Sequence, residues 1–433
     1  MSGALTGVVV VVLIIVAALA GYYAASSSIS ASTTTSTSLV TTTLPPVTNT
    51  VTNTQTEVIN GTVTKTLTST SISTSISTSI STSISTTIST TTSTPSVNEI
   101  LTGAGSTFIF PVLTAMIAQY QVGTPTVQIN YQGIGSGGGI SGLEGKTLDF
   151  AASDAPLQAA DIAKAPNALT IPATIGAVTV AYNLPGIKSN LHLTGSVVAD
   201  IFLGKVTMWN DPEITALNSN VTLPAKSILV VHRSDSSGTT FTFTGYLSIV
   251  SPTWNSTIGQ AKSVAWPVGL GSNGNAGVAG VVQGTQYTIG YVELAYALQN
   301  SMTVAAIQNA ASVWKLPTLS STAAAAAGAS ALPAGNGNWA AVNLLNEPGT
   351  NAYPIVTFSY ILVFQDLSVV NGQTLAKATA LVNFLWWEVG ATAQATASGL
   401  SYCPLPANVV ALDEATIKSI TFNGQPISIT ATQ

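Results

Sequence analysis

The composition of this 433-residue chain changes sharply near residue 97, and that change decides which part of it can fold. Residues 26–97 are mostly serine and threonine and include four consecutive SIST units between residues 71 and 86. Such a segment has too little apolar surface to offset the entropy that ordering removes. We therefore expect a disordered Ser/Thr-rich stalk over 26–97 and a folded domain over 98–433. Stalks of this composition are often O-glycosylated.

An uncharged apolar segment precedes the stalk. Residues 4–23 contain no charged side chain, and about 20 such residues can cross a bilayer as a helix. A cleaved signal segment is the alternative, although its usual basic start is missing, since Lys65 is the first basic residue. We expect residues 1–25 to be a transmembrane anchor or a signal segment. Both alternatives place the rest of the chain outside the cytoplasm, attached to the plasma membrane or, after cleavage, secreted.

Charged residues are unusually scarce. They make up 6% of the chain, against about 25% in an average protein, and the net charge is −5. The lysines are scattered singly and Arg233 is the only arginine, which excludes a nucleic-acid binder because that function needs basic clusters. Cys403 is the only cysteine, so an intrachain disulfide and a cysteine-cluster metal site are excluded. We expect neither a metal nor a cofactor.

Strand-like and helix-like patterns alternate through the folded domain. Residues 127–131 alternate apolar and polar side chains, and 228–231 form the continuous apolar run that is typical of a buried parallel strand. Apolar residues at helical spacing mark 112–120 and 243–250. This alternation predicts an α/β fold. The domain is longer than one core ordinarily supports, so we expect two lobes.

The segment 232–240 is the strongest candidate for an anion site. Arg233 ends an apolar strand, and the Ser237-Gly238-Thr239 run begins a helix. A guanidinium group offers forked donors that match oxyanions, and a helix N-terminus offers free N–H groups. Asp235 is placed to brace the arginine. The alternative is a surface arginine paired with Asp235, which we rank lower in a chain this poor in charge.

Three further segments contain groups that could bind an anion. Residues 103–108 precede a helix with Pro111 at its start, and 133–139 hold five glycines without matching a Walker A or dinucleotide-binding loop. The third segment, 149–156, contains Asp154. Taken alone, each also fits an ordinary turn or helix cap.

A hydrolase is a weaker interpretation of the same residues. His232, Asp235 and Ser237 supply the residue types of a catalytic triad, but they lie in one strand and turn, and no G-x-S-x-G motif occurs. We therefore expect a binding protein and not an enzyme.

Seven segments, taken in order, resemble the phosphate-binding proteins of ABC phosphate importers, which have the type II periplasmic-binding-protein fold. They are GAGSTF (103–108), YQGIGSGGG (131–139), DFAASDAPL (149–157), RSDSSGTTFTFTGYLS (233–248), GNAGVAGVVQGTQYTIGYVELAYAL (274–298), NAYPIVTFSYILV (351–363) and SYCPLPANVV (401–410). The resemblance covers about 99–433. It implies a phosphate-binding domain with one lobe over about 99–180 and 353–433 and the other over about 181–352.

The resemblance also implies the ligand shell and the partner. The family's phosphate ligands fall on Thr107, Phe108, Ser136, Asp154, Arg233, Ser237, Gly238 and Thr239, with Phe108 and Gly238 acting through their backbone N–H groups. Asp235 matches the carboxylate that braces the arginine. Gly137, Ser236 and Ile109 depart from the family pattern, and we expect them to affect only loop stiffness. The implied partner is the set of ABC permease subunits in the membrane.

We expect the carboxylate of Asp154 to decide which oxyanion binds. A carboxylate in an anion site repels a fully ionised oxyanion but accepts a hydrogen bond from one that carries a proton. Phosphate keeps a proton near neutral pH and sulfate does not. Sulfate should therefore bind less favourably than phosphate by about 1–3 kcal/mol for the missing hydrogen bond, and by more because of charge repulsion.

Two other functions also fit the sequence. One is a receptor for sulfate, molybdate or tungstate, and the other is a surface protein that keeps the fold for a structural role. Asn-X-Ser/Thr triplets begin at Asn60, Asn220 and Asn255, and with the stalk they predict a glycoprotein. An anchored, stalked receptor suits the surface of a cell without a periplasm, such as an archaeal cell.

Overall fold

A computed structural model of the chain describes residues 98–187, 190–328 and 332–432 and, before them, the backbone of four strands. These strands are β1 (Ser30–Val40), β2 (Asn53–Ile59), β3 (Thr62–Thr70) and β4 (Ser81–Thr91). The segment expected to be an anchor or signal, 1–25, lies outside the described residues. In the part of the chain that is described, no helix has the length and apolar character that a membrane crossing requires.

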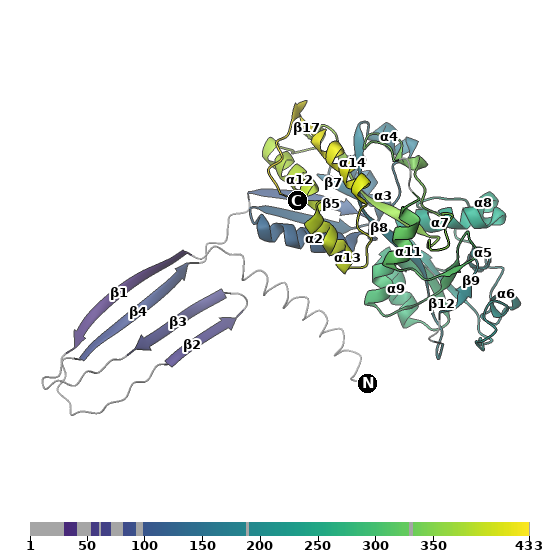
Figure 1. The fold of residues 1–433 in the computed structure, drawn as a ribbon, viewed down its shortest axis with the longest axis horizontal. Coiled ribbons are helices and arrows are strands. Elements are labelled where there is room, and N and C mark those ends of the chain that lie inside the picture. Colours follow the sequence, from purple (N-terminus) through teal and green to yellow (C-terminus); the bar gives the residue numbers. More distant parts are fainter. Residues whose placement is uncertain are drawn as a thin grey trace. The chain divides into compact units, whose positions relative to one another are not determined.

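The four N-terminal strands form an antiparallel sheet in the order β1-β4-β3-β2 (Figure 1). The disordered stalk expected over 26–97 stays a prediction. Threonine and isoleucine, which are frequent in that range, are β-branched and favour extended backbone. Contacts divide the chain into two compact units, of which the second comprises Asn98–Gln121 and Val127–Gln433.

The second unit alternates strands and helices, as the sequence predicts. Its elements up to the long central strand are β5 (Glu99–Gly105), α2 (Phe110–Gly123), β6 (Val127–Gly133), α3 (Ser136–Glu144), β7 (Phe150–Ser153), α4 (Ala159–Lys164) and β8 (Ala168–Asn183). Then follow β9 (His192–Leu193), α5 (Gly195–Phe202), α6 (Pro212–Thr215), β10 (Leu229–Arg233), α7 (Gly238–Val250), α8 (Pro252–Thr257), β11 (Leu270–Ser272), α9 (Gly274–Gly284), β12 (Thr288–Glu293) and α10 (Leu294–Gln299). The remainder comprises β13 (Thr303–Val304), β14 (Ala306–Gln308), β15 (Trp314–Lys315), α11 (Leu319–Ala326), η1 (Trp339–Ala341), β16 (Val356–Phe364), η2 (Leu367–Val369), α12 (Leu375–Glu388), α13 (Ala391–Gly399), α14 (Ala407–Lys418), β17 (Thr421–Phe422) and β18 (Gln425–Pro426).

One mixed sheet runs through this unit in the order β11-β10-β12-β8-β16-β7-β5-β6. Strand β8 changes partner along its length, since residues 168–177 pair with β16 and residues 178–183 pair with β12. We call the part built on β5, β6, β7 and β16 the first lobe and the part built on β10, β11 and β12 the second lobe. The expected two-lobed α/β fold is confirmed.

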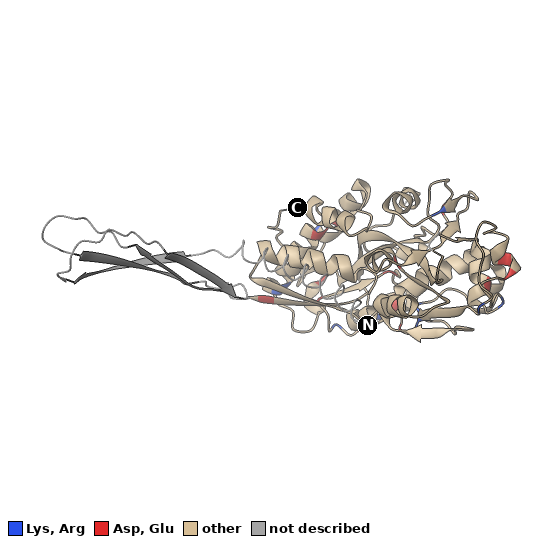
Figure 2. Ribbon diagram, turned by 90° about the horizontal axis from the view of Figure 1, so that it is seen from below, with Lys and Arg blue, Asp and Glu red and all other residues tan. Residues whose placement is uncertain are grey.

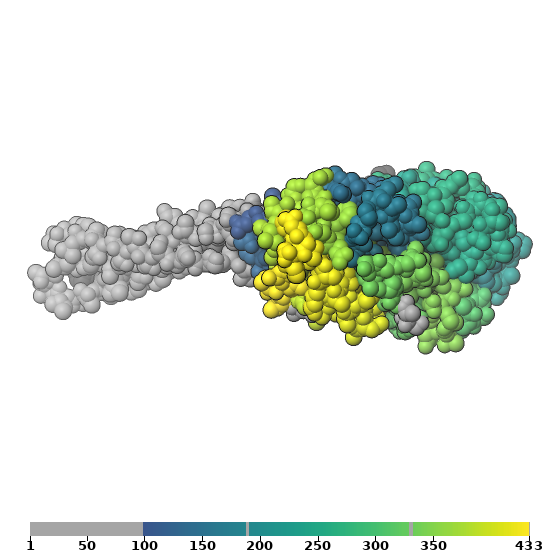
Figure 3. All heavy atoms as spheres, turned by 90° about the horizontal axis from the view of Figure 1, so that it is seen from above, coloured from purple at the N-terminus to yellow at the C-terminus, as the bar shows by residue number. Residues whose placement is uncertain are grey.

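The chain crosses between the lobes next to this change of partner. Strand β8 makes the first crossing, and the return crossing precedes β16, where the Val178 N–H donates to the Ile355 carbonyl at 2.9 Å. The expected lobe boundaries at 180/181 and 352/353 stay a prediction and lie close to these crossings. Figure 3 shows the result in space: the C-terminal residues (yellow) lie beside the first residues of the domain (blue), away from the teal residues of the second lobe.

Apolar burial is continuous across both lobes. Strand β8 is buried from Leu169 to Tyr182, because neighbouring strands and helices cover both its edges and its faces. The parallel pairs β5–β6, β5–β7 and β10–β12 place the ends of their strands at one edge of each half-sheet. Charged residues are few along this scaffold (Figure 2), so those with buried side chains are informative.

Candidate functional site

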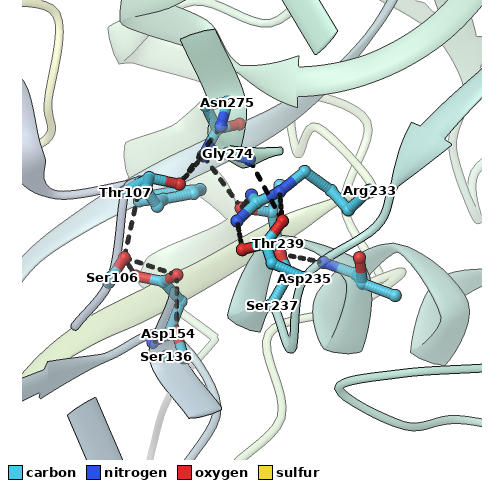
Figure 4. Close-up of polar contacts among 12 residues, drawn as sticks. Ser106, Thr107, Ser136, Asp154, Arg233, Asp235, Ser237, Thr239, Gly274 and Asn275 are labelled. Carbon is cyan, nitrogen blue, oxygen red and sulfur yellow. Dashed lines mark hydrogen bonds and ion pairs between the residues drawn. The ribbon is translucent and has the colours of Figure 1, made fainter. Parts of the chain in front are cut away.

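The predicted site residues lie at strand ends and helix starts of both lobes. In the first lobe, Thr107 and Phe108 connect β5 to α2, Ser136 begins α3 and Asp154 follows β7; in the second lobe, Arg233 ends β10 and Ser237, Gly238 and Thr239 begin α7. Figure 4 shows side chains from the two lobes pointing toward one another. The geometry brings these residues together, as expected for a site in an open-edged α/β sheet.

Asp154 is buried and surrounded by serine hydroxyls. Its carboxylate accepts hydrogen bonds from Ser106 at 2.6 and 2.7 Å, from Ser359 at 2.7 Å and from Ser136 at 3.3 Å. Only 1% of the residue is exposed. Burial raises the pKa of Asp154 to about 6, and it outweighs the serine bonds and the nearby charge of Arg233, which act to lower it.

Arg233 is held by a carboxylate of its own lobe. Its Nε donates to Asp235 at 2.7 Å, its Nη2 pairs with the other oxygen of that carboxylate, and its Nη1 donates to Thr239 Oγ1 at 3.1 Å. Burial acts to raise the pKa of Asp235, but the hydrogen bonds and charge of Arg233 hold that pKa below its ordinary value. The arginine is 3% exposed, so its charge is shielded from water and fixed in direction.

The start of α7 provides neutral donors. Ser237 caps the helix by accepting a hydrogen bond from the Thr240 N–H at 3.1 Å. The first N–H groups of a helix have no intrahelical acceptor and carry the positive end of its dipole. Gly238 lies so close to the first lobe that a β-carbon would meet Ser136 Oγ at 2.5 Å and Asp154 Oδ2 at 2.6 Å. Only glycine permits this approach.

Sequence reasoning assigned no role to three residues that the structure places in the site, Ser106, Asn275 and Ser359. Ser106 contacts Asp154, as above, and its Oγ also accepts the Phe108 N–H at 2.9 Å. That N–H, which the resemblance assigns to the ligand, therefore has a protein acceptor here. All three fall inside motifs of the resemblance, Ser106 in 103–108, Asn275 in 274–298 and Ser359 in 351–363, which is a signal for their importance.

The triad residue types do not form a catalytic relay. The His232 ring stacks on Trp266, with ring centroids 4.8 Å apart, and its Nδ1 lies 3.0 Å from the Arg233 carbonyl oxygen. Ser237 caps α7, and Asp235 binds Arg233. Each of the three therefore has partners outside the set. Among the described residues, no group of three or more His, Cys, Asp or Glu side chains could hold a metal ion.

A cavity of about 380 Å³ borders the site between the lobes. Asp154 lines it from the first lobe, Thr242 and Asn255 line it from the second lobe, and Thr357 lines it from β16. The site therefore joins a fixed guanidinium, several neutral donors and one buried carboxylate. Such a set can hold an oxyanion that has at least one proton to donate.

Comparisons with known proteins identify the family and the fold. Residues 27–387 match the PBP superfamily domain. The chain is 43% identical over 318 residues to the phosphate-binding protein PstS of Xylella fastidiosa (strain Temecula1), which covers 73% of this chain and 84% of that protein. It is 37% identical over 315 residues to the phosphate-binding protein PstS of Methanocaldococcus jannaschii, and the match covers 68% of this chain and 80% of that protein. The solved structure of a phosphate-binding protein from Stenotrophomonas maltophilia shares the fold, with a TM-score of 0.57 at 17% identity over 74% of this chain and 99% of that one.

Proposed function

This chain belongs to the PBP superfamily and, within it, to the PstS family of phosphate-binding proteins, and from that premise we propose that it captures inorganic phosphate between its two lobes. Members of this family are receptors that bind a substrate and not catalysts. The observation that carries the proposal is the buried Asp154 carboxylate, held by three serines in the same site as the fixed Arg233.

The pairing of these two groups favours phosphate over other oxyanions. Arg233, the α7 N-terminus and the hydroxyls stabilise negative charge, whereas Asp154 needs a ligand that donates a proton to it. A phosphate ion that keeps a proton meets both demands. A sulfate dianion brings no proton and leaves the buried carboxylate facing a negative oxygen, which costs about 1–3 kcal/mol for the lost bond and more for repulsion.

The protein acts outside the cytoplasm as a receptor, and we propose that it delivers phosphate to the permease subunits of an ABC importer in the plasma membrane. We further propose that residues 4–23 attach it to that membrane, unless 1–25 is cleaved as a signal segment, and that the eight residues of the predicted ligand shell hold the phosphate. The proposal needs no catalytic turnover, in line with the separate partners of His232, Asp235 and Ser237.

Calorimetric titration of the purified chain, freed of bound ligand by partial unfolding and refolding, tests this function. We expect one-site binding of phosphate and no binding heat with sulfate or molybdate. Binding of sulfate or molybdate in preference to phosphate would keep the fold and overturn the choice of ligand. If none of the three binds, the structural role gains support, and release of nitrophenol from nitrophenyl phosphate would point to an enzyme.

A further inference from the structure

Asn275 at the start of α9 is fully buried and contacts both lobes. Its side-chain oxygen accepts a hydrogen bond from the Glu293 N–H at 3.0 Å. Because a backbone N–H can only donate, this bond fixes which end of the amide is oxygen. The amide nitrogen must then face the site, where it lies 3.1 Å from the Oγ1 atoms of both Thr107 and Thr239 (Figure 4).

The two threonine hydroxyls each receive a second donor. Thr107 Oγ1 also accepts the backbone N–H of Asn275 at 3.2 Å, and Thr239 Oγ1 also accepts Arg233 Nη1 at 3.1 Å. A hydroxyl has two acceptor positions and one proton. Both acceptor positions are filled in each threonine, so each hydroxyl can only donate its proton to whatever else lies beside it.

Resting on the proposed function, we infer that Asn275 is a positioning residue that makes the hydroxyls of Thr107 and Thr239 donate to the bound phosphate. One end of the site then offers donors only, and the other end, at Asp154, offers the acceptor. The phosphate is thereby oriented, with unprotonated oxygens against the threonines and its proton toward the carboxylate. Thr107 belongs to the first lobe and Asn275 to the second, so the arrangement is complete only when the lobes meet.

A purely structural role for Asn275 makes a different prediction. If this residue only satisfied the Glu293 N–H and stabilised α9, its replacement would weaken phosphate binding by the same factor whether or not the threonine hydroxyls were present. A positioning role requires the loss to depend on those hydroxyls. A double-mutant cycle in the full chain separates the two roles.

The cycle measures phosphate affinity by calorimetry for Asn275→Ala in the unsubstituted chain and in a Thr107→Val/Thr239→Val background. In the unsubstituted chain, we expect Asn275→Ala to weaken phosphate binding about tenfold or more, since hydrogen bonds to a charged ligand are lost. In the background that lacks both threonine hydroxyls, we expect the same substitution to weaken phosphate binding by less than about threefold. An equal factor in both backgrounds, or no weakening in the first, would overturn the inference.

Asn218→Ala is the matched control. Asn218 is also a buried asparagine of the second lobe, and its side chain bonds the backbone of His192 and Ile214. Its replacement should lower the unfolding temperature and leave phosphate affinity unchanged. If Asn275→Ala does not fold, Asn275→Asp replaces it in the same cycle, because it keeps the shape and the acceptor for Glu293. Failure of the unsubstituted chain to bind phosphate would overturn the proposed function itself.

Discussion

The chain has few charged residues, and those at the site are wholly or partly buried. A buried charge needs a partner, and each of these residues has one. Arg233 is fixed by Asp235 and Thr239. The cost of burying its charge is offset only while the Asp235 carboxylate is present. Asp154 instead has only neutral donors in contact, and its negative charge is the least stabilised one in the site. The two residues therefore respond differently to substitution and to pH.

Arg233→Met tests the separation of binding from stability. It should abolish phosphate binding and destabilise the fold by about 1–3 kcal/mol, because the partly buried Asp235 loses its cation. The double substitution Arg233→Met/Asp235→Leu should recover most of the stability in urea unfolding without recovering binding. Recovery of phosphate binding in the double variant would contradict the assigned role of Arg233.

Sulfate binding should depend on pH through Asp154. The pKa of this group is raised to about 6, so in the ligand-free protein it becomes protonated as the pH falls below that value. A protonated Asp154 can donate to a sulfate oxygen, so sulfate affinity should rise between pH 7.5 and pH 5. Titrations with sulfate at both pH values measure this, and equal affinities would count against a titrating Asp154.

At the scale of elements, helices α12 and α14 carry an unusual buried pair. The carboxyl oxygens of Glu388 and Asp413 are buried, and among the described residues none of them has a hydrogen-bond partner. Burial raises the pKa of both groups well above their ordinary values, and the charge of Glu388 raises that of Asp413 further. The other charged residues of these helices pair elsewhere, Lys377 with Asp149 and Lys418 with Glu414.

This pair predicts a fold that is more stable in acid. A raised folded-state pKa gives stability that is fully present below the unfolded pKa, near 4, and is lost as the pH rises toward the folded value. Each retained proton costs about 1.4 kcal/mol per pH unit in that range. Glu388→Gln should reduce the fall in unfolding free energy between pH 4 and pH 7 in urea titrations. Glu414→Gln, on the exposed side of α14, is the control, and an unchanged slope in Glu388→Gln would contradict the prediction.

Local patterns in the sequence predict the elements well and their partners poorly. The helical spacing over 112–120 lies within α2, and the alternation over 127–131 lies within β6, because each pattern records which face is buried. The contact of Ser359 with Asp154 joins residues 205 positions apart, and no local pattern encodes such a distance. The Asn275 contact with Thr107 spans 168 positions and was missed for the same reason.

Two physical arguments apply to the N-terminal segment. The stalk prediction for 26–97, which stays a prediction, weighs apolar area against chain entropy, whereas β1–β4 follow the extended preference of threonine and isoleucine. In the site, the resemblance supplied residues that patterns alone also fit as an ordinary turn or cap, such as Asp154. Ser237, which its own pattern places at a helix start, is the cap of α7. A cap and a ligand-binding role are compatible, since both use a helix start.

At the scale of the whole molecule, the proposed function requires the lobes to close on the ligand. The described structure has contacts of that kind, since the Gly137 N–H of the first lobe donates to the Ser236 carbonyl of the second at 2.9 Å. Gly238 packs between Ser136 and Asp154 at distances that leave no room for a side chain. Closure is therefore sensitive to a single methyl group at this position.

Gly238→Ala should hold the lobes apart. We expect phosphate binding at least about tenfold weaker and a smaller decrease in radius of gyration on adding phosphate, measured by small-angle X-ray scattering. Gly280→Ala on α9 is the matched control, because a β-carbon there meets no atom within 4 Å. It should keep the affinity and add about 0.5–1 kcal/mol of stability. Wild-type affinity and compaction in Gly238→Ala would rule out this account of closure.

Competition between phosphate and sulfate for the unsubstituted chain and for Asp154→Asn, measured side by side at pH 7.5, tests the central claim most directly. In the unsubstituted chain, a large excess of sulfate should leave labelled phosphate bound. In Asp154→Asn, the amide oxygen still accepts the ligand proton while its nitrogen can donate to an unprotonated oxygen, so phosphate should bind and sulfate should now displace it. An unchanged ratio of phosphate to sulfate affinity in Asp154→Asn would contradict the claim that the ligand proton meeting Asp154 selects phosphate.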